Sequence, residues 1–134
     1  MTLRELSKLY YIKKHIARLE DKIAEIDGRL DPGVGKVTGM PHNPSPQNNV
    51  ELMILTRIDT EEKLKREIEE YVKERERLEE YINSVTDPHI RLIMLYRFVD
   101  LLTWGQIAAK IGGNNTEGSV SQACYNFIKK SRKK

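Results

Sequence analysis

The sequence predicts an all-α protein, in which an N-terminal antiparallel helical hairpin of the coiled-coil type precedes a C-terminal three-helix helix-turn-helix domain. Three observations predict this fold class. Apolar residues recur three and four positions apart in two long segments. Only 8 glycines and 5 prolines occur in 134 residues, which suits long helices. The last third contains three short amphipathic segments separated by residues that cap helices. A chain of this length buries one modest core.

The first long segment carries an unbroken apolar stripe with spacings that alternate between three and four. Its members are Leu9, Ile12, Ile16, Leu19, Ile23, Ile26 and Leu30. Charged residues fill the remaining positions, so we expect a helix over residues 3–30 that buries a narrow seam against another helix. Tyr10 and Tyr11 lie beside the seam, which favours a docking role for this segment.

Four of the five prolines and three of the eight glycines lie within residues 31–48. This stretch has almost no apolar periodicity and predicts a long flexible loop. A second helix is expected over residues 49–85. Its predicted seam is Leu64, Ile68, Tyr71, Arg75, Leu78, Ile82 and Val85. Upstream of Leu64 the pattern slips, since Leu52, Leu55 and Ile58 lie on a shifted stripe.

The two helices are natural partners, and three arrangements are open: an antiparallel hairpin, a parallel pairing, and an exchange of helices between two chains. At 1.5 Å per residue they measure about 40 Å and about 55 Å. A hairpin within one chain is the simplest arrangement. A loop of 18 residues, counted from 31 to 48, extends to about 60 Å, so pairing between two chains is also possible.

Capping residues divide the last third into three helices. Asp87-Pro88 reads as an N-cap followed by the first helical position, so a helix begins there and the preceding one ends near Val85. Thr103 is the predicted N-cap of a short helix that turns Ile107, Ala108 and Ile111 inward. Residues 112–115, Gly-Gly-Asn-Asn, form the turn. Thr116 is then the predicted N-cap of the final helix.

The final helix is amphipathic. Val120, Cys124, Phe127 and Ile128 share one side and predict its buried face. The other side carries amide, hydroxyl, aromatic and cationic groups, which suit the major groove of DNA and its phosphates. The predicted DNA-binding residues are Ser119, Ser121, Gln122, Tyr125, Asn126, Lys129, Lys130, Arg132 and Lys133.

Charge is distributed unevenly along the chain. Residues 1–86 contain 15 Lys and Arg against 17 Asp and Glu, a net charge of −2. Residues 87–134 contain 8 against 3, a net charge of +5. We therefore expect a helical arm over residues 1–86 and a basic domain over residues 87–134 whose partner is an acidic polymer, here double-stranded DNA.

Residues 90–130 resemble region 4 of bacterial sigma factors and the related phage late-gene regulators of the ArpU and RinA type. The matching stretches are Arg91-Leu92-Ile93-Met94-Leu95-Tyr96-Arg97-Phe98, Thr103-Trp104-Gly105-Gln106-Ile107-Ala108 and Thr116-Glu117-Gly118-Ser119-Val120-Ser121-Gln122. The resemblance implies a phage or prophage transcriptional regulator that reads promoter DNA through its last helix. Its arm would form a homodimer or contact RNA polymerase.

Two other functions fit the same pattern. Small terminase subunits also combine a helix-turn-helix with helical oligomerisation segments, so a DNA-packaging adaptor is one alternative. The other is a protein–protein interaction module without DNA binding, in which the basic tail aids solubility.

Signals for catalysis, cofactors and membranes are missing from the sequence. A single cysteine, Cys124, excludes an internal disulfide and suits a reducing bacterial cytoplasm. His15, His42 and His89 lie in separate segments without ligand spacing, so no metal site is expected. Paired acids such as Glu61-Glu62 stand among cations on a solvated helix. No apolar run reaches the roughly 18 residues that a membrane span requires. We expect a cytoplasmic protein that is not an enzyme and binds no cofactor.

Overall fold

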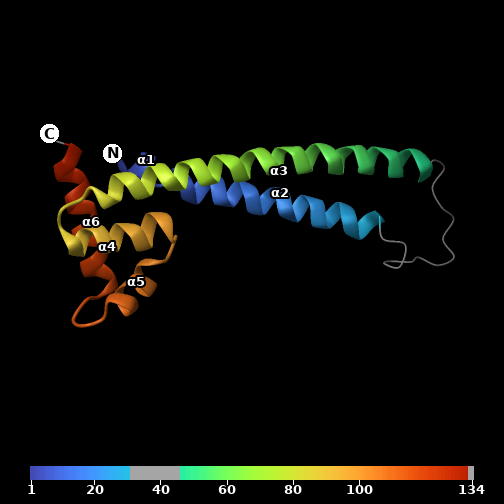
Figure 1. Cartoon of the computed structure of the whole chain (residues 1–134). Coiled ribbons are helices and arrows are strands. Elements are labelled where there is room, and N and C mark those ends of the chain that lie inside the picture. Colours follow the sequence, from blue (N-terminus) through green and yellow to red (C-terminus); the bar gives the residue numbers. More distant parts are fainter. Residues whose placement is uncertain (31–45, 133–134) are drawn as a thin grey trace. The chain divides into compact units, whose positions relative to one another are not determined.

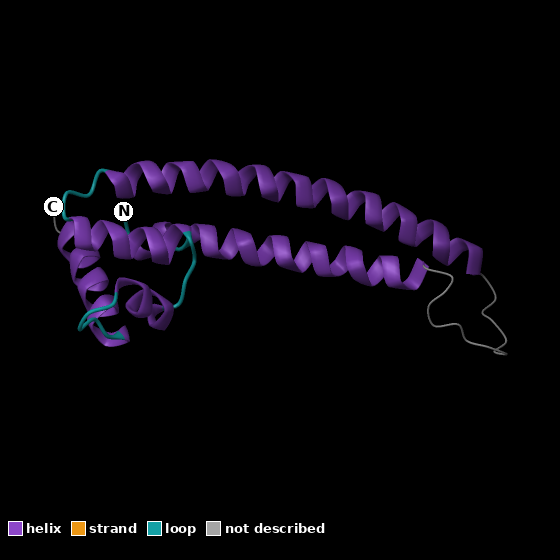
Figure 2. Cartoon of the chain, turned by 60° about the horizontal axis from the view of Figure 1, so that its bottom comes forward, coloured by secondary structure: helices purple, strands orange, loops and turns teal. Residues whose placement is uncertain are grey.

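The computed structural model describes residues 1–30 and 46–132, with side chains for residues 1–30 and 50–131. Most of these residues are helical and none lies in a strand (Figures 1 and 2), which confirms the predicted all-α class. By their contacts they divide into two compact units. Unit 1 contains Met1–Ile12 and Tyr71–Lys134, and unit 2 contains Lys13–Glu70. The functional boundary at residue 86 stays a prediction.

Unit 1 begins with a short helix, α1 (Leu3–Leu6), whose N-cap Thr2 accepts a hydrogen bond of 3.2 Å from the Glu5 amide. The first residues of α2 (Lys8–Leu30) and the last turns of α3 (Pro46–Asn83) also belong to this unit. Leu9, Leu78 and Ile82 are completely buried there. The N-terminus and the end of α3 thus contribute to one core.

Four further elements complete unit 1: α4 (Pro88–Met94), the π-helical turn η1 (Leu95–Val99), α5 (Trp104–Ile111) and α6 (Glu117–Arg132). Asp87 caps α4, since its carboxylate accepts from the amides of His89 and Ile90, and Pro88 is the first helical residue. The predicted helix start is confirmed. Buried residues of these helices pack with Leu6, Leu9, Leu78 and Ile82 in a single cluster.

The chain turns sharply between α4 and α5. In the π-helical turn the Asp100 amide donates to the Leu95 carbonyl at 3.0 Å, five residues back. Leu101 then adopts φ of +59°, the left-handed region that a leucine rarely occupies. The Leu102 amide donates to the Tyr96 carbonyl at 2.9 Å. These bonds end the helix and direct the backbone into the cap of α5.

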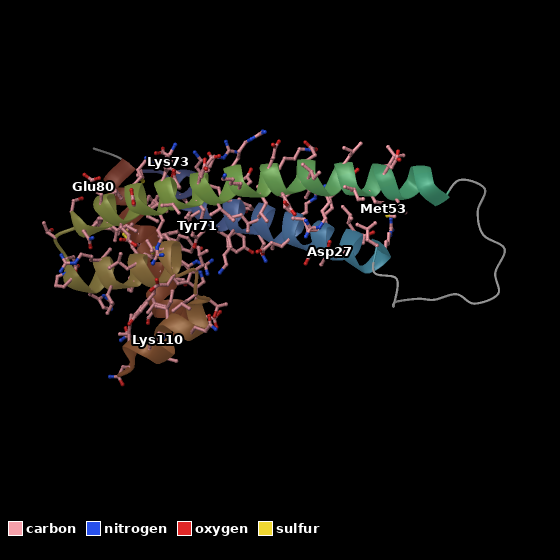
Figure 3. All side chains as sticks on the ribbon, turned by 45° about the vertical axis from the view of Figure 1, so that its right-hand side comes forward. Asp27, Met53, Tyr71, Lys73, Glu80 and Lys110 are labelled. Carbon is pink, nitrogen blue, oxygen red and sulfur yellow. The ribbon has the colours of Figure 1, made fainter. Side chains whose placement is uncertain are left out.

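In unit 2 the end of α2 lies beside the beginning of α3 (Figure 3). Asp27 of α2 and Arg57 of α3 form an ion pair, with Arg57 Nη2 at 3.2 Å from Asp27 Oδ2. The apolar stripe predicted for the first helix faces α3, because Leu19 and Ile26 are buried and the other members in this unit are half-buried. The predicted seam of the first helix is therefore confirmed.

The boundaries of α3 differ from those expected. The helix starts at Pro46 rather than residue 49, because proline suits the first turn, where its missing amide hydrogen would have no helical partner. It ends at Asn83 rather than Val85, and the amides of Ser84 and Val85 close a tighter turn on Tyr81 and Ile82. Residues 31–45 of the predicted loop lie outside the described residues.

Five members of the predicted α3 seam, Leu64, Tyr71, Leu78, Ile82 and Val85, are buried or half-buried, but two positions are shifted by one residue. Ile68 and Arg75 are exposed, whereas Glu67 is half-buried and Glu74 is buried. Within unit 1, Glu74 meets Lys8 at 3.9 Å and Arg77 at 3.2 Å, which compensates its carboxylate. In unit 2, Thr60 is buried and donates to the Thr56 carbonyl at 2.7 Å. Because these polar groups are paired, Glu74 and Thr60 are able to lie in the seam, and a pattern of apolar residues does not predict them.

The Asp27–Arg57 pair predicts a local pH dependence in unit 2. The hydrogen bond from Arg57 lowers the pKa of Asp27 below its ordinary value. The pair therefore stabilises the fold above the ordinary pKa of aspartate, and this contribution disappears as the pH falls through the lowered folded pKa. In an NMR titration, Arg57→Ala should return the pKa of Asp27 to the ordinary range. Arg66→Ala, which removes an exposed pair with Glu62, should leave it unchanged.

Candidate nucleic-acid interface

The start of α5 is held by a reciprocal capping box. The Gln106 amide donates to the Thr103 hydroxyl at 3.2 Å, and the Thr103 amide donates to the Gln106 side-chain oxygen at 2.9 Å. The predicted N-cap is confirmed. The partner role of Gln106 was missed, although a glutamine three residues after a threonine is the sequence signature of this box.

The turn between α5 and α6 uses glycine where the backbone requires it. Gly112 and Gly113 have φ values of +74° and +65°, which only glycine adopts without cost. Asn115 closes the turn, since its side-chain amide donates to the Gly112 carbonyl at 2.9 Å. The Thr116 hydroxyl then accepts from the Ser119 amide at 3.1 Å. Thr116 is thus the N-cap of α6, as predicted.

One face of α6 is anchored in the core of unit 1. Val120 and Cys124 are completely buried and Ile128 nearly so, as predicted from their spacing. Burial raises the pKa of the Cys124 thiol to about 12, and the nearby charge of Arg97 opposes this shift. The thiol is therefore protonated at neutral pH and fills space as a small apolar group.

The opposite face of α6 presents polar side chains to solvent. Gln122, Asn126 and Lys129 are exposed and follow one another at spacings of four and three residues, on successive turns of the helix. Lys130 is exposed next to them. The geometry brings these four predicted residues together on one face. Amides that donate and accept are combined there with two positive charges.

The two predicted serines are bound locally. The Ser119 hydroxyl donates to the Thr116 carbonyl at 3.0 Å and lies 2.8 Å from the Thr116 amide, which donates to it. The Ser121 hydroxyl donates to the Gly118 carbonyl at 3.1 Å. Both hydroxyls are therefore engaged by backbone groups within three residues, and that of Ser119 also caps the start of α6 by accepting from the Thr116 amide.

Tyr125 belongs to an aromatic stack that joins the start of α5 to the middle of α6. Its ring meets Trp104 edge-on, with ring centres 5.6 Å apart. The Arg97 guanidinium lies 4.4 Å from the centre of the Trp104 ring and donates to the Leu102 carbonyl at 3.0 Å. Tyr125 remains 41% exposed, so this stack orients a ring that still reaches solvent. The spacing of these residues in the sequence does not predict this stack.

The remaining basic residues divide between structural and surface positions. Arg91 donates to the Val85 carbonyl at 2.9 Å, which ties α4 to the turn that follows α3. Lys110 lies 5.9 Å from the centre of the Tyr96 ring and is exposed (Figure 3). Arg132 ends α6, and its side chain, like the whole of Lys133, lies outside the described residues.

A pocket of about 320 Å³ lies elsewhere in unit 1. Tyr10 and Tyr11 line it from α2, and Leu101 and Thr103 line it from the turn before α5. The two tyrosine rings meet edge-on at 5.2 Å. These tyrosines therefore line a concavity, and their docking role stays a prediction.

Comparisons with protein-family models, curated proteins and solved structures found no match. Within residues 1–30 and 50–131, no three metal-ligating side chains gather into a group that would hold an ion. None of the described helices combines the length and the apolar character that crossing a membrane requires.

The burial of Cys124 predicts a thiol that reacts slowly. Because the pKa is raised to about 12, very little thiolate exists near neutral pH, and the surrounding core blocks access. Modification by an aromatic disulfide reagent at about pH 8 should be at least about 100-fold slower in the native protein than in guanidinium chloride. Absorbance of the released thiol measures both rates. Similar rates would contradict the packing of α6.

The bonds of Ser119 predict that its hydroxyl supports the fold. Ser119→Ala should lower the free energy of unfolding by about 0.5 to 1 kcal/mol, because it removes one side of the capping box. Thermal and urea unfolding followed by circular dichroism measure this loss. Ser131→Ala, in the last turn of the same helix, provides the control and should have a smaller effect.

Proposed function

We propose that the protein is a DNA-binding transcriptional regulator, encoded by a phage or prophage, that reads promoter DNA with the outer face of α6. The main support is the row of Gln122, Asn126 and Lys129, exposed on a helix whose opposite face is packed in the core. A rigid helix with such a face is suited to the major groove.

In this proposal α5, the turn from Gly112 to Asn115 and α6 act as a helix-turn-helix. The recognition helix is α6, and α5 crosses the DNA backbone. Gln122 and Asn126 each carry a side-chain amide that pairs with adenine in two hydrogen bonds. Both side chains project from the same face of the helix, one turn apart. In this proposal they contact neighbouring base pairs. Ser119 and Ser121 then act through the helix, since their hydroxyls bond to its backbone.

The positive charges at the end of α6 provide contacts to phosphate. Lys129 and Lys130 are exposed, and residues 87–134 carry a net charge of +5. Such contacts supply affinity without sequence preference and weaken as salt rises. We therefore expect the amides in the middle of α6 to contact DNA bases. The lysines toward its end are expected to contact DNA phosphates.

The remaining part of the proposal concerns the helical arm. We expect α2 and α3 to act as an antiparallel coiled-coil hairpin that forms a homodimer or contacts RNA polymerase. Support comes from the ion pair of Asp27 with Arg57 and from the buried leucines and isoleucines of α2. The two tyrosines beside the pocket in unit 1 offer a contact surface for a protein partner.

Selection of bound DNA from a random library, followed by titration at two salt concentrations, tests the DNA-binding proposal. Gln122→Ala combined with Asn126→Ala should reduce the preference for the selected site about tenfold or more, because two base contacts are lost. Affinity for random DNA should change little. Lys129→Ala with Lys130→Ala should weaken binding to every sequence and reduce the salt slope by about two.

A matched control separates the interface from total charge. Lys63→Ala with Lys73→Ala removes the same charge from α3, where both side chains are exposed. This variant should bind DNA nearly as the unchanged protein does. Two results would overturn the proposed role of α6: no DNA binding at low salt, or an equal loss of DNA affinity in the Lys129/Lys130 and the Lys63/Lys73 double variants.

A further inference from the structure

The outer flank of α3 carries an exposed apolar stripe. Within unit 2, the side of α3 that faces α2 carries Met53, Thr60 and Leu64, which are buried or half-buried. About a third of a turn around the helix, Ile54, Ile58 and Ile68 are 45%, 52% and 44% exposed. Isoleucines aligned on one flank and left in water are typical of a surface that another molecule covers.

This stripe has the spacing of a helix seam. Ile54, Ile58, Glu61, Lys65 and Ile68 follow one another at intervals of four, three, four and three. That alternation is the one by which two helices pack along their length. The stripe is separate from the seam with α2, so α3 is able to pack against a second helix while it keeps the first.

The stripe is also complementary to itself when read in opposite directions. Two copies of α3 placed antiparallel and centred on Lys63 bring Ile58 opposite Ile68, and Glu61 opposite Lys65. All five residues of the stripe lie in unit 2.

We infer that a second copy of this chain covers the stripe, with the two α3 helices packed antiparallel about a two-fold axis. Charge complementarity selects this occupant and this direction, because each central glutamate meets a lysine. A parallel pairing in register would set Glu61 against Glu61 and Lys65 against Lys65, which repel. A two-fold interface of one patch with itself is the commonest arrangement of homodimers.

Local ion pairs do not compete strongly with this interface. Glu61 pairs with Arg57 on the same helix. Both side chains are at least one third exposed, and such a surface pair contributes little to stability. The Glu61 carboxylate therefore remains able to face a second helix. The inference deepens the proposed dimerisation of the arm and does not depend on DNA binding.

Sedimentation equilibrium of the full chain over a wide concentration range tests the interface. The unchanged protein should be a dimer that dissociates on dilution. Ile58→Glu places a charge opposite Ile68 and should raise the dimer Kd at least tenfold. Leu55→Glu is the matched control, because Leu55 is 64% exposed on α3 but lies outside the stripe. It should leave the Kd nearly unchanged.

Charge reversal tests the direction and the register. Glu61→Lys alone, and Lys65→Glu alone, set like charges opposite each other in both central pairs, so each should raise the dimer Kd about tenfold. An equimolar mixture of the two variants should associate again, because the lysines of one copy then face the glutamates of the other. Circular dichroism should show equal helix content in all variants.

Three results would overturn the inference: a monomer at every concentration, equal effects of Ile58→Glu and Leu55→Glu, or a mixture that associates no better than the single variants. DNA affinity, measured in parallel on the same proteins at low salt, reports on α6 separately. A protein that binds DNA as a monomer would thus refute the interface and leave the proposed function intact.

Discussion

The structure of unit 1 depends on one shared apolar core. Leu9, Leu78 and Ile82, from the start of α2 and the end of α3, pack in the same cluster as Ile107, Val120 and Cys124. The elements from α4 to α6 supply ten of the fifteen buried residues of this cluster, and a domain as small as these helices alone buries a small share of its surface. The N-terminal leucines therefore contribute to holding the candidate DNA-binding helix in place.

This core determines which side of α6 meets solvent. With Val120, Cys124 and Ile128 buried, the helical geometry leaves Gln122, Asn126 and Lys129 on the outside. Local hydrogen bonds then distinguish the polar residues that cap the helix from those that face solvent. The hydroxyls of Thr116 and Ser119 each accept from the other residue's amide, a group that a helix start leaves unpaired, whereas the amide and ammonium side chains extend into solvent. The residues that cap the helix are thus distinct from those proposed for recognition.

In α3, some polar residues lie in the seam and some apolar residues face solvent, which is the opposite of the usual arrangement. In unit 2 its seam toward α2 includes Arg57 and Thr60, while isoleucines lie exposed on another flank. A polar seam is tolerated because Arg57 meets Asp27 and the Thr60 hydroxyl meets a backbone carbonyl. Exposed isoleucines have no such compensation within the described residues, which is the physical basis for assigning them to a second copy of the chain.

The sequence by itself determined the helical class, the stripe of α2, the caps at Asp87, Thr103 and Thr116, and the inner face of α6. These features follow from local geometry, since periodicity and capping act over a few residues. Only the tertiary structure decided the two shifted positions of the α3 seam, such as Glu74 buried in place of Arg75, and the stack of Arg97, Trp104 and Tyr125. Both depend on partners distant in sequence: Lys8 meets Glu74 across more than sixty residues, and no spacing within a single helix encodes such a contact.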